Sequence, residues 1–98
     1  MIHLTDGQSR IVTEIVAQRI PDRRVVAFGS RVDGNPKPFS DLDLAIYGNE
    51  PLPLTLLGQL RDDFSESSLP FRVDLVDANA ISDEFRQIIE KKHEIIQA

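Results

Sequence analysis

Apolar residues recur at helical spacing in three parts of this chain. They predict a first helix whose buried stripe runs through residues 11–20, and Thr5 with Gln8 fits a loose capping box at its start. The same spacing predicts a second helix over residues 53–65. A third helix is expected to begin at Ser82, where acidic residues in the first turn favour the helix dipole. Each helix thus has an apolar face to bury.

Short apolar runs predict three strands, over residues 25–28, 41–47 and 71–76. The first run is apolar throughout, which is typical of a strand covered on both faces or on one face plus a helix. In the other two runs, charged residues alternate with apolar ones over part of the length. The tail at residues 94–97 is compatible with more helix or with a short final strand.

Three aspartates lie on the predicted strands. Side chains alternate along a strand, so Asp41 and Asp43 share a face while the apolar residues between and after them point the other way. Asp74 lies at the centre of the third strand. Clustered carboxylates repel each other and cost stability without a counter-ion, and magnesium takes oxygen ligands from carboxylates, water and substrate phosphates. The pattern predicts that Asp41, Asp43 and Asp74 hold divalent metal, with two ions suited to phosphoryl or nucleotidyl transfer.

A Gly-Ser turn closes the first strand, with ten residues between it and Asp41. Gly29 lets a phosphate approach the backbone closely. Ser30 offers a hydroxyl and, if a helical turn begins here, is expected to be its N-cap, next to amides that favour anions. Arg31 can add charge-assisted hydrogen bonds to phosphate. A lone Gly-Ser is usually only a turn and a lone Asp-x-Asp only a solvated strand face, but their relative placement favours one site.

In Gly29-Ser30, the ten intervening residues, Asp41-Leu-Asp43 and the later Asp74, the chain resembles the DNA polymerase β-like nucleotidyltransferase superfamily. Within it, the chain is similar to the minimal, MNT-type nucleotidyltransferases over nearly its whole length. The resemblance implies an α/β (α+β) fold, a small mixed β-sheet with helices packed on one face, and a strand for residues 94–97. It implies ATP or a related triphosphate with magnesium, a catalytic triad of Asp41, Asp43 and Asp74, and triphosphate contacts at Gly29, Ser30 and Arg31.

Many MNT proteins are antitoxins paired with a HEPN-domain ribonuclease toxin, and some inactivate that toxin by transferring AMP to a tyrosine. The resemblance therefore implies a nucleotidyltransferase that moves AMP to an acceptor hydroxyl, expected to be a tyrosine of a HEPN toxin. Asp74 is then closest in role to a general base, although metal activation can suffice. Two alternatives stay open. One is a non-catalytic antitoxin that neutralises its partner by forming a complex, and the other is a nucleotidyltransferase for a small molecule such as an aminoglycoside.

Composition narrows the functional classes. A chain of 98 residues suffices for one domain, taken as residues 1–98, with one modest core. The net charge of −5 disfavours a basic nucleic-acid-binding surface and a template-directed polymerase. No cysteine is present, so thiolate metal sites are excluded. The lack of a membrane-spanning apolar run and of a signal-peptide pattern fits a cytoplasmic protein. His93 is expected to be solvated or to face a partner rather than to bind metal.

Overall fold

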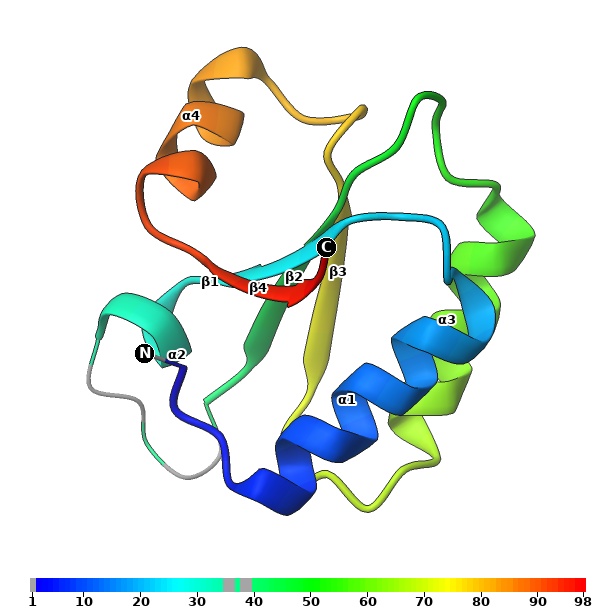
Figure 1. Ribbon diagram of the computed structural model, residues 1–98, viewed down its shortest axis with the longest axis vertical. Coiled ribbons are helices and arrows are strands. Elements are labelled where there is room, and N and C mark those ends of the chain that lie inside the picture. The colour runs from blue at the N-terminus through cyan, green and yellow to red at the C-terminus, as the bar shows by residue number, and fades with distance from the viewer. Residues whose placement is uncertain (1, 35–36, 38–39) are drawn as a thin grey trace.

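A mixed β-sheet organises the chain, of which the computed structural model describes residues 2–34, 37 and 40–98. Within these residues the sheet has four strands in the order β3-β2-β1-β4 (Figure 1). β2 runs antiparallel to β1 and parallel to β3, and β4 is antiparallel to β1. The elements in chain order are α1 (Asp6–Arg19), β1 (Val25–Phe28), α2 (Ser30–Asp33), β2 (Leu42–Ile46), α3 (Leu54–Ser65), β3 (Val73–Asp77), α4 (Asp83–Lys91) and β4 (Glu94–Gln97).

α1 and α4 begin where their capping residues predict. The amide of Gln8 donates to Oγ1 of Thr5 at 3.1 Å and the amide of Thr5 donates to Oε1 of Gln8 at 3.0 Å, which confirms the capping box of α1. Ser82 is the N-cap of α4, and its Oγ accepts from the amide of Phe85. These caps satisfy amides that have no partner inside their helices. The strand expected at residues 94–97 is also present, as β4.

α1 and α3 pack against one face of the sheet. The larger core cluster joins Val12 and Val16 of α1 to Leu60 and Phe64 of α3, and it includes the inward side chains of β1 and β2. The apolar residues that alternate with the aspartates of β2, Leu42 and Leu44 among them, are fully buried here. Burial of this face fixes the register of β2, because a slip by one residue would bury its acidic side chains instead.

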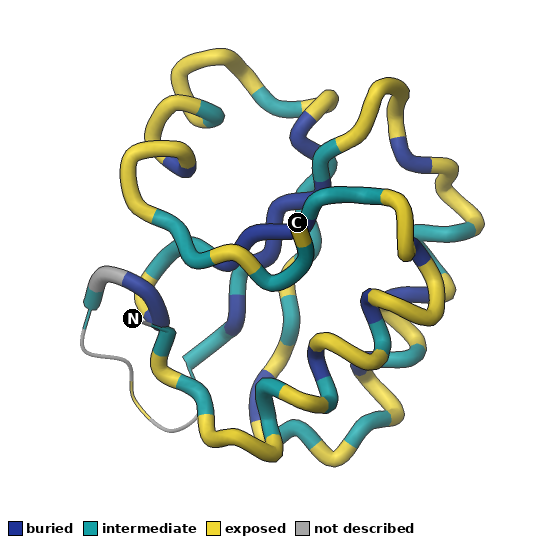
Figure 2. Tube along the Cα trace, viewed as in Figure 1, coloured by how far each residue is buried: buried dark blue, intermediate teal, exposed yellow. Residues whose placement is uncertain are grey.

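α4 packs on the opposite face, so the expectation of helices on one face alone is correct for α1 and α3 and wrong for α4. Ile89 of α4 forms a second, smaller cluster with Val26 and Ala45. The rings of Phe28 and Phe85 meet edge to face, with centroids 5.8 Å apart. Figure 2 shows that most of α4 remains exposed beyond this contact. Within the described residues, no helix is both long enough and apolar enough to cross a membrane.

Candidate active site

Two of the three aspartates are neighbours across the sheet. β2 and β3 pair in parallel with Asp43 opposite Asp74, and β1 pairs with β2 so that Phe28 is opposite Asp43. Residues opposite one another in a ladder project from the same face. Asp41 directly precedes β2, two residues before Asp43. The register therefore places Asp43 between the end of β1 and Asp74 of β3, on the sheet face that also carries α4.

The Asp43 carboxylate lies in a partly buried and acidic environment. Its pKa is raised to about 6, first by burial and then by the negative charges of Asp74 and Asp41. Asp43 is half-buried whereas Asp74 is exposed. Removing a carboxylate from water next to two others disfavours its ionised form, and a nearby cation would reverse this effect.

Gly29 lies directly against Asp43. It has φ +80°, a conformation that favours glycine, and a Cβ built on it would overlap Oδ2 of Asp43. Gly29, rather than Ser30, is the N-cap of the short helix α2. The expectation that Ser30 would be the N-cap is thus wrong by one residue, because Gly29 adopts the non-helical conformation that precedes the first turn. Ser30 is the first residue of α2 and its side chain is exposed.

Arg31 is buried and bound to the backbone. Only 5% of it is exposed, its Nε donates to the carbonyl of Ser40 at 2.9 Å, and its Nη1 donates to the carbonyl of His3 at 2.8 Å. The guanidinium also lies 4.0 Å from the centroid of the Phe71 ring. Burial lowers the pKa of Arg31. These contacts give Arg31 a structural role next to the site, and its contact with phosphate stays a prediction.

Sequence reasoning missed the anchoring of Arg31. The acceptors are main-chain carbonyls of His3 and Ser40, which carry no side-chain signal, and Phe71 reads simply as a core residue. The bond to Ser40 ties α2 to the residue that precedes Asp41. Arg31 therefore positions the start of the acidic motif relative to the Gly-Ser turn.

Asp77, the last residue of β3, makes the contacts of a turn residue. Its Oδ2 accepts from the amide of Leu52 at 2.7 Å and its Oδ1 accepts from the amide of Asn79 at 2.9 Å. The carboxylate thus joins two loops, and it is not part of the acidic group around Asp43.

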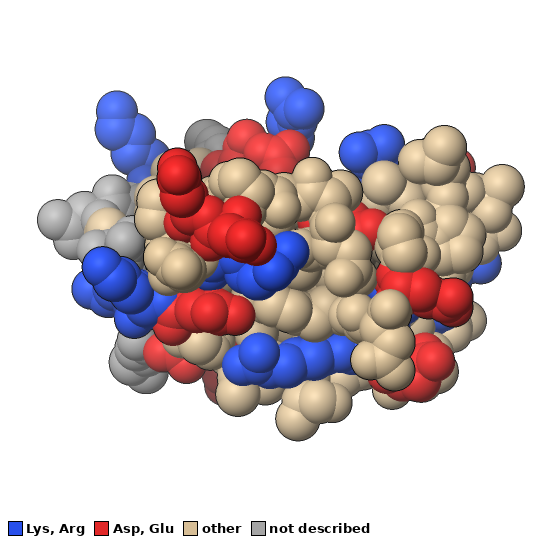
Figure 3. Space-filling model, turned by 90° about the horizontal axis from the view of Figure 1, so that it is seen from above, with Lys and Arg blue, Asp and Glu red and all other residues tan. Residues whose placement is uncertain are grey.

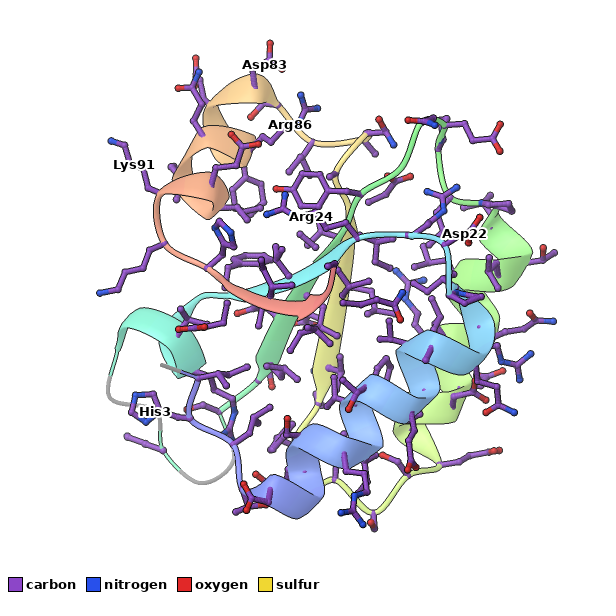
Figure 4. The ribbon with its side chains drawn as sticks, viewed as in Figure 1. His3, Asp22, Arg24, Asp83, Arg86 and Lys91 are labelled. Atoms are coloured by element: carbon purple, nitrogen blue, oxygen red, sulfur yellow. The ribbon has the colours of Figure 1, made fainter. Side chains whose placement is uncertain are left out.

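His93 is also structural. Its Nε2 lies 3.3 Å from Nη2 of Arg24, and its Nδ1 lies within 3.2 Å of the carbonyls of Ile89 and Glu90 at the end of α4. Arginine only donates and carbonyls only accept, so Nε2 accepts and Nδ1 carries the proton. Figure 4 shows Arg24 directed into the space between the sheet and α4. His93 therefore caps the end of α4, and its ring contacts Arg24 rather than solvent alone.

The chemistry of the donor set fits a divalent cation bound with a nucleotide. Asp41, Asp43 and Asp74 offer only oxygen ligands, and burial together with the charges of Asp74 and Asp41 raises the pKa of Asp43. Within the described residues, however, no group of three or more histidine, aspartate or glutamate side chains is arranged to hold a metal ion. Magnesium commonly uses one or two carboxylates and takes its other ligands from water and substrate phosphates. The site therefore fits magnesium together with a triphosphate better than magnesium alone.

One face of the molecule mixes positive and negative side chains. Lysine and arginine side chains are interspersed with aspartate and glutamate over the face seen in Figure 3. A backbone-binding surface would require positive side chains gathered in one patch or stripe.

The mixed sheet, the Gly-Ser turn and the paired aspartates define a nucleotidyltransferase domain. The family model described as Polymerase beta, Nucleotidyltransferase matches residues 11–98, and the chain belongs to this family. It is 52% identical over 87 residues to the probable protein adenylyltransferase MntA of Haemophilus influenzae, an alignment that covers 89% of this chain and 76% of that protein.

Solved structures show the same fold. A crystal structure of a toxin–antitoxin with AMP-PNP matches with a TM-score of 0.78 at 23% identity, covering 92% of this chain and 73% of that chain. A tri-AMPylated Shewanella oneidensis HEPN toxin in complex with MNT antitoxin matches with a TM-score of 0.70 at 22% identity, covering 92% and 69%. At these identities the matches establish the shared fold, which agrees with the fold class that the motifs predict.

Proposed function

We propose that this chain is a magnesium-dependent protein adenylyltransferase that moves AMP from ATP to a tyrosine hydroxyl of a partner HEPN-domain toxin, and so acts as an antitoxin. The observation that carries the proposal is the half-buried carboxylate of Asp43, which lies between Gly29 and Asp74 with its pKa raised to about 6. Support for the protein acceptor comes from the relative with 52% identity, a probable protein adenylyltransferase. AMP-PNP and an AMPylated HEPN toxin occur in structures with the same fold.

Each residue has a distinct role in this proposal. Asp41, Asp43 and Asp74 would hold magnesium, which when bound neutralises charge on the reacting phosphate. Gly29 gives the triphosphate close access to the backbone, and Ser30 offers an exposed hydroxyl beside it. Asp74 is exposed, unlike its register partner Asp43, and its carboxylate accepts the proton of the acceptor hydroxyl.

We also propose how the chain is organised, where it works and what it binds. Residues 1–98 fold as a single minimal nucleotidyltransferase domain, which works in the cytoplasm and forms a hetero-oligomer with its toxin. Nucleic acid is not bound directly, in keeping with the net charge of −5. A domain of this size leaves little room for a dedicated acceptor pocket, so the acceptor surface comes largely from the partner.

The test is to co-express the chain with a candidate HEPN-domain partner, such as the product of a neighbouring gene, and to weigh the purified partner by mass spectrometry. We expect a mass increase equal to one or more AMP groups, lost when the chain carries Asp41→Asn and Asp43→Asn together. Circular dichroism checks that the double variant is folded. The carboxylate assignment fails if a folded double variant still transfers AMP at the wild-type level.

A non-catalytic antitoxin is the second candidate. It is favoured by the lack, among the described residues, of a three-carboxylate arrangement ready to hold metal. In that case, the double variant should still form the complex and still protect cells from the toxin, and the partner should carry no AMP. Survival of cells that express the toxin with the double variant therefore separates the two candidates.

A further inference from the structure

A groove of about 370 Å³ runs along the outer side of β3. Its walls come from the second half of α3, with Arg61 and Phe64, and from the segment that leads into and along β3, with Phe71, Arg72 and Asp74. Because Asp74 lines it, the groove adjoins the candidate active site. It nevertheless lies on the side of Asp74 away from Asp43, since among the described residues β3 pairs only with β2.

The backbone of β3 has an open edge in this groove. β3 is the first strand of the sheet, and its parallel pairing uses the carbonyl of Arg72, which accepts from the amide of Leu42 at 2.9 Å. In a parallel ladder alternate residues bond to the neighbour, so the amides and carbonyls of Val73 and Leu75 point outward. An exposed edge of this kind is a template for a further strand.

The groove also carries two uncompensated positive charges. Arg61 and Arg72 are both exposed, and neither guanidinium group has a hydrogen bond or ion pair with any residue that the structure describes. They stand out in a chain with a net charge of −5. Two arginines beside an open strand edge, with Phe64 and Phe71 beneath, complement an extended segment that has acidic side chains alternating with apolar ones.

The position of the groove fits the acceptor rather than the nucleotide. Across the sheet the order is the Gly-Ser turn after β1, Asp43 on β2, Asp74 on β3, and then the groove. In the proposed reaction pyrophosphate leaves at the turn. The attacking and leaving oxygens lie roughly in line in phosphoryl transfer, so the acceptor arrives from the opposite side, past Asp74.

We propose that this groove, the β3-edge groove, docks an extended acidic segment of the acceptor protein as an added strand on β3. The inference rests on the proposed function, because it assumes a protein acceptor. It differs from that proposal in naming the surface that holds the acceptor and the chemistry that the surface selects.

The test uses the co-purified partner complex and two readouts. First, hydrogen exchange is compared between the free and the complexed chain, with the amides of Val73 and Leu75 expected to be protected in the complex. Second, affinity for the partner is measured for the double variant Arg61→Glu, Arg72→Glu. We expect it to bind at least about tenfold more weakly, the loss that reversal of close charge pairs causes.

The matched control is the single variant Arg10→Glu, which is compared with each single groove variant. Arg10 is an exposed residue of α1 and changes the net charge by the same amount. We expect Arg61→Glu and Arg72→Glu each to weaken the complex while Arg10→Glu does not. Titration with magnesium and ATP should give the wild-type affinity for all of these variants.

The outcomes separate this inference from the proposed function. A complex that transfers AMP but leaves Val73 and Leu75 unprotected, or that tolerates both groove variants, overturns the groove assignment and leaves the enzyme in place. Loss of ATP affinity in the groove variants also overturns it, since the groove would then belong to the nucleotide. A complex that protects the β3 edge without any AMP transfer supports the groove and contradicts the enzyme.

Discussion

Gly29 and Asp43 are in such close contact that a side chain at position 29 would displace the Asp43 carboxylate. A Cβ on Gly29 would overlap Oδ2 of Asp43, and the φ of +80° at Gly29 is unfavourable for any other residue. The turn that is expected to receive the triphosphate and the carboxylate that is expected to hold its magnesium are therefore one structural unit, which changes in either residue should disrupt.

Gly29→Ala tests this unit. We expect the substitution to lower the free energy of unfolding by about 1–3 kcal/mol, because it adds backbone strain and displaces the Asp43 carboxylate. Binding of magnesium and ATP should be lost as well. Urea denaturation and isothermal titration measure the two effects.

Gly58→Ala is the matched control. Gly58 lies inside α3, and a Cβ there has nothing within 4 Å. Alanine should therefore raise stability by about 0.5–1 kcal/mol, with nucleotide binding unchanged. Equal behaviour of the two alanine variants would contradict the contact between Gly29 and Asp43.

Arg31→Lys decides between two roles of the arginine. Lysine keeps the charge but cannot reach the carbonyls of His3 and Ser40 together, so we expect a loss of about 1.5–3 kcal/mol in stability. Urea denaturation measures this loss, with Arg10→Lys on the exposed face of α1 as the control. An unchanged stability combined with weaker ATP binding would instead assign Arg31 to the phosphate.

Much of the site follows from periodicity in the sequence. The alternation of Asp41, Asp43 and Asp74 with apolar residues predicts a shared face, and the register confirms it for Asp43 and Asp74. The capping box at Thr5 and the N-cap at Ser82 were equally predictable, since both depend on residues three positions apart.

Other features depend on contacts that sequence spacing does not encode. The N-cap of α2 is decided by the conformation of Gly29, and Arg31 binds carbonyls that any residue could supply. The sequence of α4 does not tell which side of the sheet the helix covers. In the structure, Ile89 of α4 packs with Val26 and Ala45 on the face opposite α1. Long-range packing settles these features.

His93→Ala tests the structural reading of the histidine. The substitution removes the bonds to Arg24 and to the last carbonyls of α4, so stability should fall by about 1 kcal/mol. The contacts of His93 are with Arg24 and the end of α4 and not with Asp43, so magnesium-dependent ATP binding should keep its wild-type affinity. A folded variant that loses ATP binding would show that His93 belongs to the active site.

Asp43→Asn should stabilise the protein in the absence of nucleotide. The difference between a pKa of about 6 in the fold and the ordinary value of 3.8 corresponds to about 3 kcal/mol for a fully buried group, and solvent screening reduces it to about 1–2 kcal/mol for this half-buried one. Between these two pKa values, the folded state keeps a proton that the unfolded chain has released. The contribution of Asp43 to wild-type stability therefore falls as pH rises from about 4 to 6 and stays low above that range.

Asparagine does not ionise, so the advantage of the variant over the wild type should grow from pH 4 to pH 7. Urea denaturation at both pH values measures it, and Asp62→Asn on the exposed surface of α3 provides the control for a lost surface charge. A constant difference in stability across this pH range would contradict a raised pKa of Asp43 in the folded protein. So would a variant that is less stable than the wild type at pH 7. A stabilised variant that no longer binds magnesium and ATP would show that the site trades stability of the free protein for ligand binding.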